Sequence, residues 1–179
     1  MTFRSYLASF SATWKALTGA ALLTAALLKF TPLVPPWPDE RGSGASALAI
    51  AACVIGIVIS YQCGGATARM RGRLAIAAMS VATLLIFAYV YLTAARVASL
   101  VQPVQGVEVT RRVVVGTTLR NPADADKTPE QLLELYGLDG SAWTASSLVA
   151  SRLTLLSVYM GFYMALTFGI GMSQGSARR

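Results

Sequence analysis

Four long apolar runs dominate this chain of 179 residues. Each is 19 to 23 residues long, close to the roughly 20 apolar residues that a helix needs to cross a hydrocarbon core of about 30 Å. Only the first run contains charged side chains, Lys15 near its start and Lys29 near its end. The runs are Ala12–Val34, Ala45–Cys63, Leu74–Ala95 and Leu153–Met172. This pattern predicts a small polytopic membrane protein.

The runs also indicate which kind of spanning element they form. Backbone groups find no water inside a bilayer, so each span must be a helix or a strand of a closed barrel. The runs lack the two-residue alternation of barrel strands, and hydrophobic residues make up 55% of the chain. We therefore expect an all-α integral membrane protein, a four-helix bundle that spans the membrane at 12–34, 45–63, 74–95 and 153–172. Residues 1–11, with aromatic side chains at helical spacing, are expected to form an interfacial amphipathic helix.

The segment 96–152 is the one sizeable part outside the predicted spans. Val107–Val109 and Arg112–Val115 are rich in β-branched residues and predict a short strand pair or one bent strand. Further on, Thr128 at a cap position, Pro129 in the first turn and Gln131 at the third position predict a helix that ends at Gly137. We expect an ordered extracytoplasmic subdomain between the third and fourth spans.

The distribution of lysine and arginine predicts the orientation in the membrane. A short turn at 64–73 contains Arg69, Arg71 and Arg73, and the tail 173–179 ends in two more arginines, with no acid in either segment. Positive residues concentrate in short cytoplasmic loops. We therefore expect the protein in a bacterial inner membrane, with both termini on the cytoplasmic side. The net charge of +7 then indicates orientation and contact with anionic lipids, and no nucleic-acid binding is expected.

Residues with catalytic or ligand-binding chemistry are scarce in the predicted spans. The chain has no histidine, and no aspartate or glutamate lies in any apolar run. Intramembrane catalysis and proton relays usually depend on such residues, so we expect no enzyme, no cofactor and no metal site. Asp124 and Asp126 are a weak pattern for a divalent cation, and a solvated loop is the preferred interpretation. Two uses remain for Arg111, Arg112 and Arg120: binding phosphate-bearing lipid heads, or pairing with acids of the same loop.

Lys29 lies at the outer end of the first run. One interpretation is a lysine whose charged end reaches the interface, and the other is a member of a cationic ring around an outer vestibule.

Small residues recur at intervals of four on three runs, a spacing that lets helices in lipid approach closely. One such ridge lies at the start of the first run. The two that we select as helix-packing or oligomer contacts are Ala52, Gly56 and Ser60 on the second run, and Gly161, Ala165, Gly169 and Ser173 on the fourth. Packing within the chain and packing between subunits both remain open.

These observations favour a homo-oligomeric protein that forms or gates a pore or perturbs the bilayer. The alternative is a non-catalytic anchor or accessory subunit that docks a soluble cytosolic partner through Arg69, Arg71 and Arg73. In size and number of spans the chain resembles the small four-span components of bacterial conflict and antiviral operons. That resemblance implies a sensor or membrane-disrupting effector beside a cytosolic partner, and it is one of architecture, without a shared motif.

Overall fold

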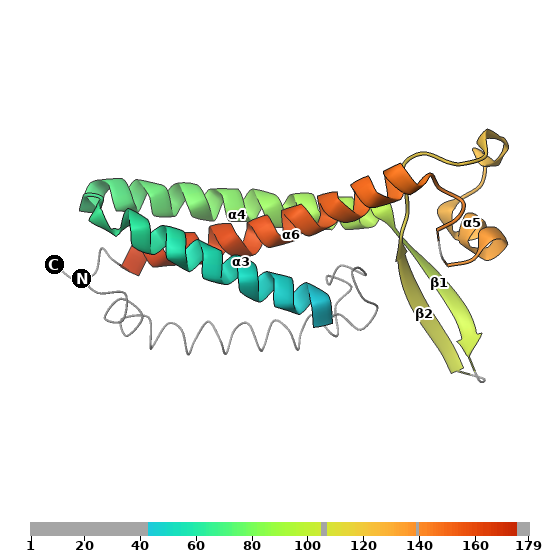
Figure 1. The fold of residues 1–179 in the computed structure, drawn as a ribbon, viewed down its shortest axis with the longest axis horizontal. Coiled ribbons are helices and arrows are strands. Elements are labelled where there is room, and N and C mark those ends of the chain that lie inside the picture. Colours follow the sequence, from blue (N-terminus) through green and yellow to red (C-terminus); the bar gives the residue numbers. More distant parts are fainter. Residues whose placement is uncertain (1–42, 105–106, 139, 175–179) are drawn as a thin grey trace. The chain divides into compact units, whose positions relative to one another are not determined.

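The computed structural model describes residues 43–104, 107–138 and 140–174 (Figure 1). The predicted interfacial helix 1–11, the predicted first span 12–34 with Lys29, and most of the tail 173–179 lie outside the described residues. Within the described residues, three helices are long and apolar enough to cross a membrane, at Ala47–Gly65, Ala68–Arg96 and Ala145–Ser173. The protein is mostly helical, and a fourth span stays a prediction.

The first two described helices are joined by a short connection. Helix α3 (Ser43–Gln62) leads through the 3-10 turn η1 (Cys63–Gly65) into α4 (Ala68–Arg96). The hydroxyl of Thr67 accepts a hydrogen bond from the backbone N–H of Met70 at 3.4 Å, which is the geometry of an N-cap residue. Because α4 begins here, the three arginines that we placed in a turn at 64–73 lie in the first two turns of a helix.

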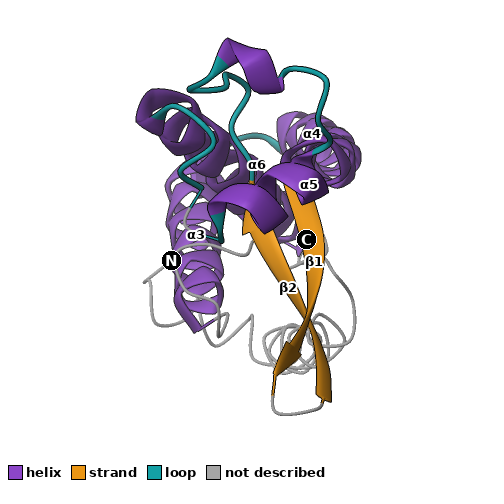
Figure 2. Ribbon diagram, turned by 90° about the vertical axis from the view of Figure 1, so that its right-hand side faces the viewer, coloured by secondary structure: helices purple, strands orange, loops and turns teal. Residues whose placement is uncertain are grey.

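A two-stranded antiparallel hairpin follows α4 directly. Strand β1 (Val97–Val104) pairs with β2 (Val107–Val114) (Figure 2). In the register of this pair, Val97 lies opposite Val114. The predicted β element at 107–115 is one strand, and its partner is the segment just before it, for which we predicted no strand. No glycine or proline lies at the junction of Arg96 and Val97. The sequence pattern therefore did not indicate where the helix ends and the strand begins.

The short helix of the outer segment is confirmed. After the 3-10 turn η2 (Pro122–Asp124), helix α5 (Pro129–Tyr136) begins at Thr128 and ends at Gly137. The Thr128 hydroxyl accepts from the backbone N–H of Gln131, and the Gln131 side chain accepts in return from the backbone N–H of Thr128 at 2.9 Å. Two otherwise unpaired donors are thereby satisfied. Gly137 has φ 87°, a conformation that suits a residue without Cβ.

The last helix, α6 (Ala145–Gln174), begins eight residues before the predicted start of the fourth span at 153. Its first turns contain Ser146, Ser147 and Ser151, which lowered the apolar signal there. The backbone N–H of Leu148 donates to the carbonyl of Thr144 at 3.1 Å, so the helix is already formed at these polar residues. Hydropathy indicated the part suited to lipid and missed the polar extension of the same helix.

The chain divides into two compact units, which we describe separately. Within the described residues, the helical unit contains 46–84 and 160–174, and the mixed unit contains 43–45, 85–104, 107–138 and 140–159. The mixed unit has a hydrophobic core in which α5 packs on β1. Its buried residues are Ala98, Leu100, Val115, Leu132, Leu133, Ala142, Trp143 and Leu148. A core this small depends on good packing, because short segments bury little apolar surface.

Candidate functional site

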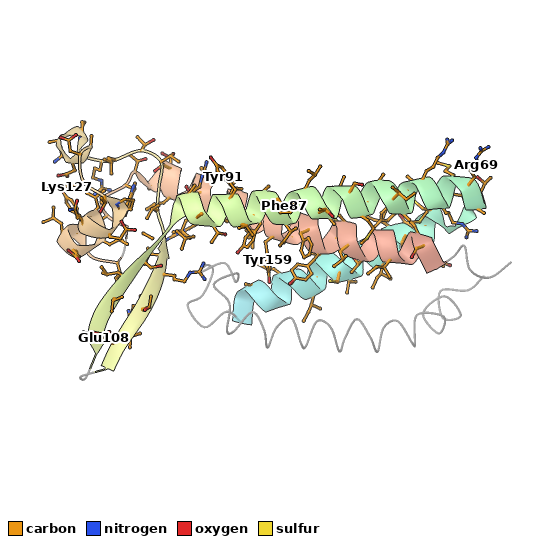
Figure 3. The ribbon with its side chains drawn as sticks, turned by 180° about the vertical axis from the view of Figure 1, so that it is seen from behind. Arg69, Phe87, Tyr91, Glu108, Lys127 and Tyr159 are labelled. Atoms are coloured by element: carbon orange, nitrogen blue, oxygen red, sulfur yellow. The ribbon has the colours of Figure 1, made fainter. Side chains whose placement is uncertain are left out.

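The start of α4 carries a concentrated positive charge. Arg69 lies at the start of α4 (Figure 3) and is exposed, as is Arg73 one turn later. Arg71 is half-buried, and its Nε atom is buried without a hydrogen-bond partner. A helix N-terminus has a partial positive charge of its own. Three arginines there add to that potential instead of opposing it, so this surface attracts anions. Lipid phosphates and acidic protein side chains both have suitable chemistry.

The small residues of α3 lie on one buried face of this helix. Ala52 and Ser60 each expose 1% of their surface, and Gly56 between them is also buried. A Cβ atom at Gly56 would lie 2.6 Å from the carbonyl oxygen of Met164 in α6. The two helices therefore approach each other as closely as a glycine allows, within the helical unit. Contact of this face with a second copy stays a prediction.

The predicted ridge on α6 is less uniform. Gly169 is buried, and a Cβ atom there would lie 3.1 to 3.3 Å from atoms of Met79 and Ala78 in α4. Gly161 and Ala165 are half-buried, and Ser173 is exposed and donates to the carbonyl of Ile170. Gly56 and Gly169 thus bring α3 and α4, respectively, close to α6. The four α6 positions thus differ in burial within the described residues, and their contact with a second copy stays a prediction.

A buried carboxylate organises the polar part of the mixed unit. Asp124 is 6% exposed, and its Oδ1 accepts from Lys127 Nζ while its Oδ2 accepts from the Tyr136 hydroxyl, both at 2.6 Å. These bonds, the Lys127 bond foremost, lower the pKa of Asp124 below its ordinary value. The same ion pair raises the pKa of Lys127. The carboxylate therefore ties α5 to the preceding loop.

This arrangement leaves little free chemistry near the two aspartates. Both oxygens of Asp124 are engaged, Asp126 is exposed, and among the described residues no three His, Cys, Asp or Glu side chains gather around a common point. An open depression of ≈ 410 Å³ lies over α5 and is lined by Lys127, Gln131, Glu134 and Leu135. Its openness to solvent makes it unsuited to a reaction that must exclude water.

Arg111, Arg112 and Arg120, which were considered together in the sequence, lie in different surroundings. Arg111 and Arg120 are exposed, and Arg112 is half-buried. Burial lowers the pKa of Arg112, and the nearby Tyr89 acts in the opposite direction. Within the described residues the one ion pair is Lys127 with Asp124, so no acid pairs with Arg111 or Arg120 there.

One polar group of the mixed unit was not selected from the sequence. Nη1 of Arg96, the last residue of α4, donates to Oγ of Ser151 in α6 at 3.3 Å, and Ser151 is 0% exposed. Nearer the helix centres, the ring centroids of Tyr89 and Tyr159 lie 5.5 Å apart. The sequence feature that could have pointed to this group is the position of Arg96 and Arg152, which adjoin the ends of two apolar runs.

Comparison with protein-family models, with curated proteins and with solved structures found no match for this chain. The function is therefore inferred from the residues and their geometry.

Proposed function

We propose that this protein is a non-catalytic membrane anchor or accessory subunit. It would hold an ordered subdomain on the outer side of the membrane and dock an acidic soluble partner at the start of α4 on the cytoplasmic side. If α4 crosses the membrane, the arginines before its apolar part and the hairpin after it face opposite compartments. The concentration of positive residues near the first end supports its cytoplasmic location.

The observation that carries the proposal is the charge at the start of α4. Arg69 and Arg73 are exposed at a helix N-terminus whose own dipole is positive, and no described acid pairs with them. Repulsion among these charges disfavours the surface by itself, and a partner with complementary negative charge would relieve it. The mixed unit supports the second half of the proposal, because its core and polar network give it a defined shape to present.

A charge-reversal experiment tests the docking surface. The variant R69E/R73E changes two exposed arginines and leaves the half-buried Arg71 in place, and R111E/R120E makes the same charge change on the outer segment. We expect wild type and R111E/R120E to retain the same cytosolic protein during purification after cross-linking, and R69E/R73E to lose it. A polyglutamate peptide should compete with this interaction. Equal retention by all three proteins would contradict docking at α4.

The pore or bilayer-perturbing function is a second candidate, and an exposed apolar stripe on α4 is compatible with it. A stripe on α4 at Ile76, Leu84, Phe87 and Tyr91 is exposed, with Ile76 71% and Tyr91 74% accessible. Figure 3 shows Phe87 and Tyr91 on this helix. Lipid covers such a stripe in a monomer, and a second copy covers it in an assembly. Ion flux through liposomes containing only this protein, with a native mass above that of one chain, would support this candidate over the first.

A further inference from the structure

Two arginines mark the ends of the apolar parts of α4 and α6. The apolar run 74–95 stops at Arg96, and the run 153–172 begins directly after Arg152. Each run has about the length that crosses the hydrocarbon core. The side chains of Arg96 and Arg152 therefore belong at the boundary between the hydrocarbon and the phosphate groups of the lipid heads, on the side opposite the arginines at 69–73.

The packing of α4 against α6 within the mixed unit places the two arginines at the same depth. The helices are antiparallel there, and the rings of Tyr89 and Tyr159 are in contact. Arg96 follows Tyr89 by seven residues, and Arg152 precedes Tyr159 by seven residues. Seven residues are close to two helical turns, a rise of about 10.5 Å. Each arginine thus lies nearly on the same side of its helix as the tyrosine, and both lie at one level.

The immediate contacts show donors without acceptors. Arg96 donates one hydrogen bond, to the fully buried Ser151 hydroxyl. Arg152 is the neighbour of Ser151 and is half-buried, and its Nε atom is buried without a partner. Thr93, one turn before Arg96, also has a buried hydroxyl without a partner. Within the described residues neither Arg96 nor Arg152 makes an ion pair. A guanidinium donor without an acceptor is costly, so an anion that accepts from the accessible part of these half-buried side chains would stabilise them.

We propose that Arg96 and Arg152 form a binding site for a phosphate group at the outer membrane boundary, with Ser151 holding the Arg96 side chain in place. A guanidinium presents its donors in a planar fork that matches two phosphate oxygens. In a membrane the phosphate at this depth belongs to a phospholipid head, and an anionic head has no cation of its own to compete with the arginines. This site is independent of the docking surface at Arg69 and Arg73.

The test uses the full chain, purified in a maltoside detergent free of phospholipid. Three probes are added separately: phosphatidylglycerol, a diacylglycerol with the same acyl chains, and inorganic phosphate. The readouts are the thermal unfolding midpoint and the number of lipids retained in native mass spectrometry. We expect phosphatidylglycerol to raise the midpoint and to be retained, and the diacylglycerol, which lacks the phosphate, to do neither. Equal effects of the two lipids would overturn the proposal, because the acyl chains alone would then explain binding.

The variants localise the effect. R96Q/R152Q should weaken phosphatidylglycerol binding about a hundredfold, since it removes two guanidinium groups and each charge-assisted hydrogen bond contributes on the order of one tenfold step. R111Q/R120Q, which removes two exposed charges of the same segment, should bind as wild type does. If R96Q/R152Q does not fold, R96K/R152K keeps the charge, loses the fork and should bind with intermediate affinity. Wild-type binding by the arginine variant that folds would overturn the site.

The inorganic phosphate arm identifies the source of the phosphate. Stabilisation by inorganic phosphate that disappears in R96Q/R152Q supports the same site with a free anion as occupant. Stabilisation by phosphatidylglycerol alone supports a lipid head. No response to either probe would contradict a phosphate site at these residues.

Discussion

The helical unit and the mixed unit differ in how far along the chain their side-chain hydrogen bonds reach, although both contain local bonds such as that from the Thr154 hydroxyl to the Ala150 carbonyl. In the helical unit, the hydroxyls of Ser60, Thr83 and Thr167 donate to backbone carbonyls three or four residues earlier on their own helices. In the mixed unit, Tyr136 donates to a carboxylate 12 residues away, and Arg96 donates to a serine 55 residues away. The first pattern satisfies polar groups locally, as lipid requires. The second joins distant segments, as in a water-soluble domain.

The same contrast holds for apolar packing. The helical unit relies on the absence of side chains, at Gly56 and Gly169, to bring backbones together. The mixed unit relies on large buried side chains, with Trp143 4% exposed and Leu133 1% exposed. Hydrophobic burial contributes stability where the unfolded segment meets water. Between helices already in lipid, close van der Waals contact contributes more. The comparison predicts that the two units respond to different kinds of substitution.

The largest effect is expected from removing the central aromatic residue of the mixed unit. Trp143→Ala should destabilise this unit by about 3–5 kcal/mol, because the buried apolar surface of the ring is lost and a cavity is left behind. Hydrogen exchange followed by mass spectrometry should show faster exchange at β1, β2 and α5. Leu135→Ala is the control, because Leu135 lies on α5 and is exposed. Unchanged exchange in Trp143→Ala would show that the unit is held together by something other than this core.

A substitution of intermediate effect tests the helical unit. Gly56→Ala places a Cβ atom 2.6 Å from the Met164 carbonyl oxygen, and a backbone atom cannot rotate away, so α3 and α6 must separate. We expect a cost of about 1–3 kcal/mol, as for other overpacked sites, measured by the unfolding midpoint in detergent. Gly72→Ala on α4 is the matched control, with nothing within 4 Å of its Cβ position. Equal midpoints for the two variants would contradict close packing at Gly56.

How much of this could be predicted from the sequence depends on the range of each interaction. The Thr128–Gln131 capping pair was predicted because its partners lie three residues apart and the motif has a fixed spacing. The close contact at Gly56 is compatible with the small-residue spacing on α3. Strand β1 was missed because its identity depends on pairing with β2, and its valines simply continue the apolar run of α4. Periodicity reports the preference of one segment, whereas pairing is a property of two.

The candidate sites also divide into those that a local sequence pattern indicates and those that depend on contacts between distant segments. The arginines at 69–73 were selected from charge alone, and the structure adds that they begin a helix. The pairing of Arg96 with Ser151 was not accessible, because it requires the register between two antiparallel helices separated by the whole outer segment. Likewise, Asp124 looked like a solvated loop residue. Its burial results from the way the loop at 121–128 folds back toward Tyr136, which no local pattern records.

The smallest effect is expected from the pH dependence of the Asp124 network. The bonds from Lys127 and Tyr136 lower the pKa of Asp124 below its ordinary value of 3.8. The stabilisation is therefore complete above that value and is lost as the pH falls through the lower pKa of the folded state. Lys127 has a pKa raised above 10.5, so its share is complete below 10.5 and is lost as the pH rises through the higher value.

Asp124→Asn should remove the acid part of this dependence. We expect the difference in unfolding midpoint between wild type and Asp124→Asn to be constant from pH 8 to about pH 5 and to shrink below about pH 4, where the carboxylate begins to take up a proton. Asp126→Asn is the control for acid effects elsewhere, because Asp126 is exposed on the same loop. In Lys127→Met, the unfolding midpoint should fall less steeply at acid pH than in wild type, because one of the two bonds to the carboxylate is lost. Some of the dependence should remain, because the Tyr136 hydroxyl still donates to the carboxylate. The effect stays small because the Lys127 side chain is 42% exposed, so water competes for its charge. A difference between wild type and Asp124→Asn that stays constant down to pH 2 would show that the carboxylate contributes shape to the loop and no charge-dependent stability.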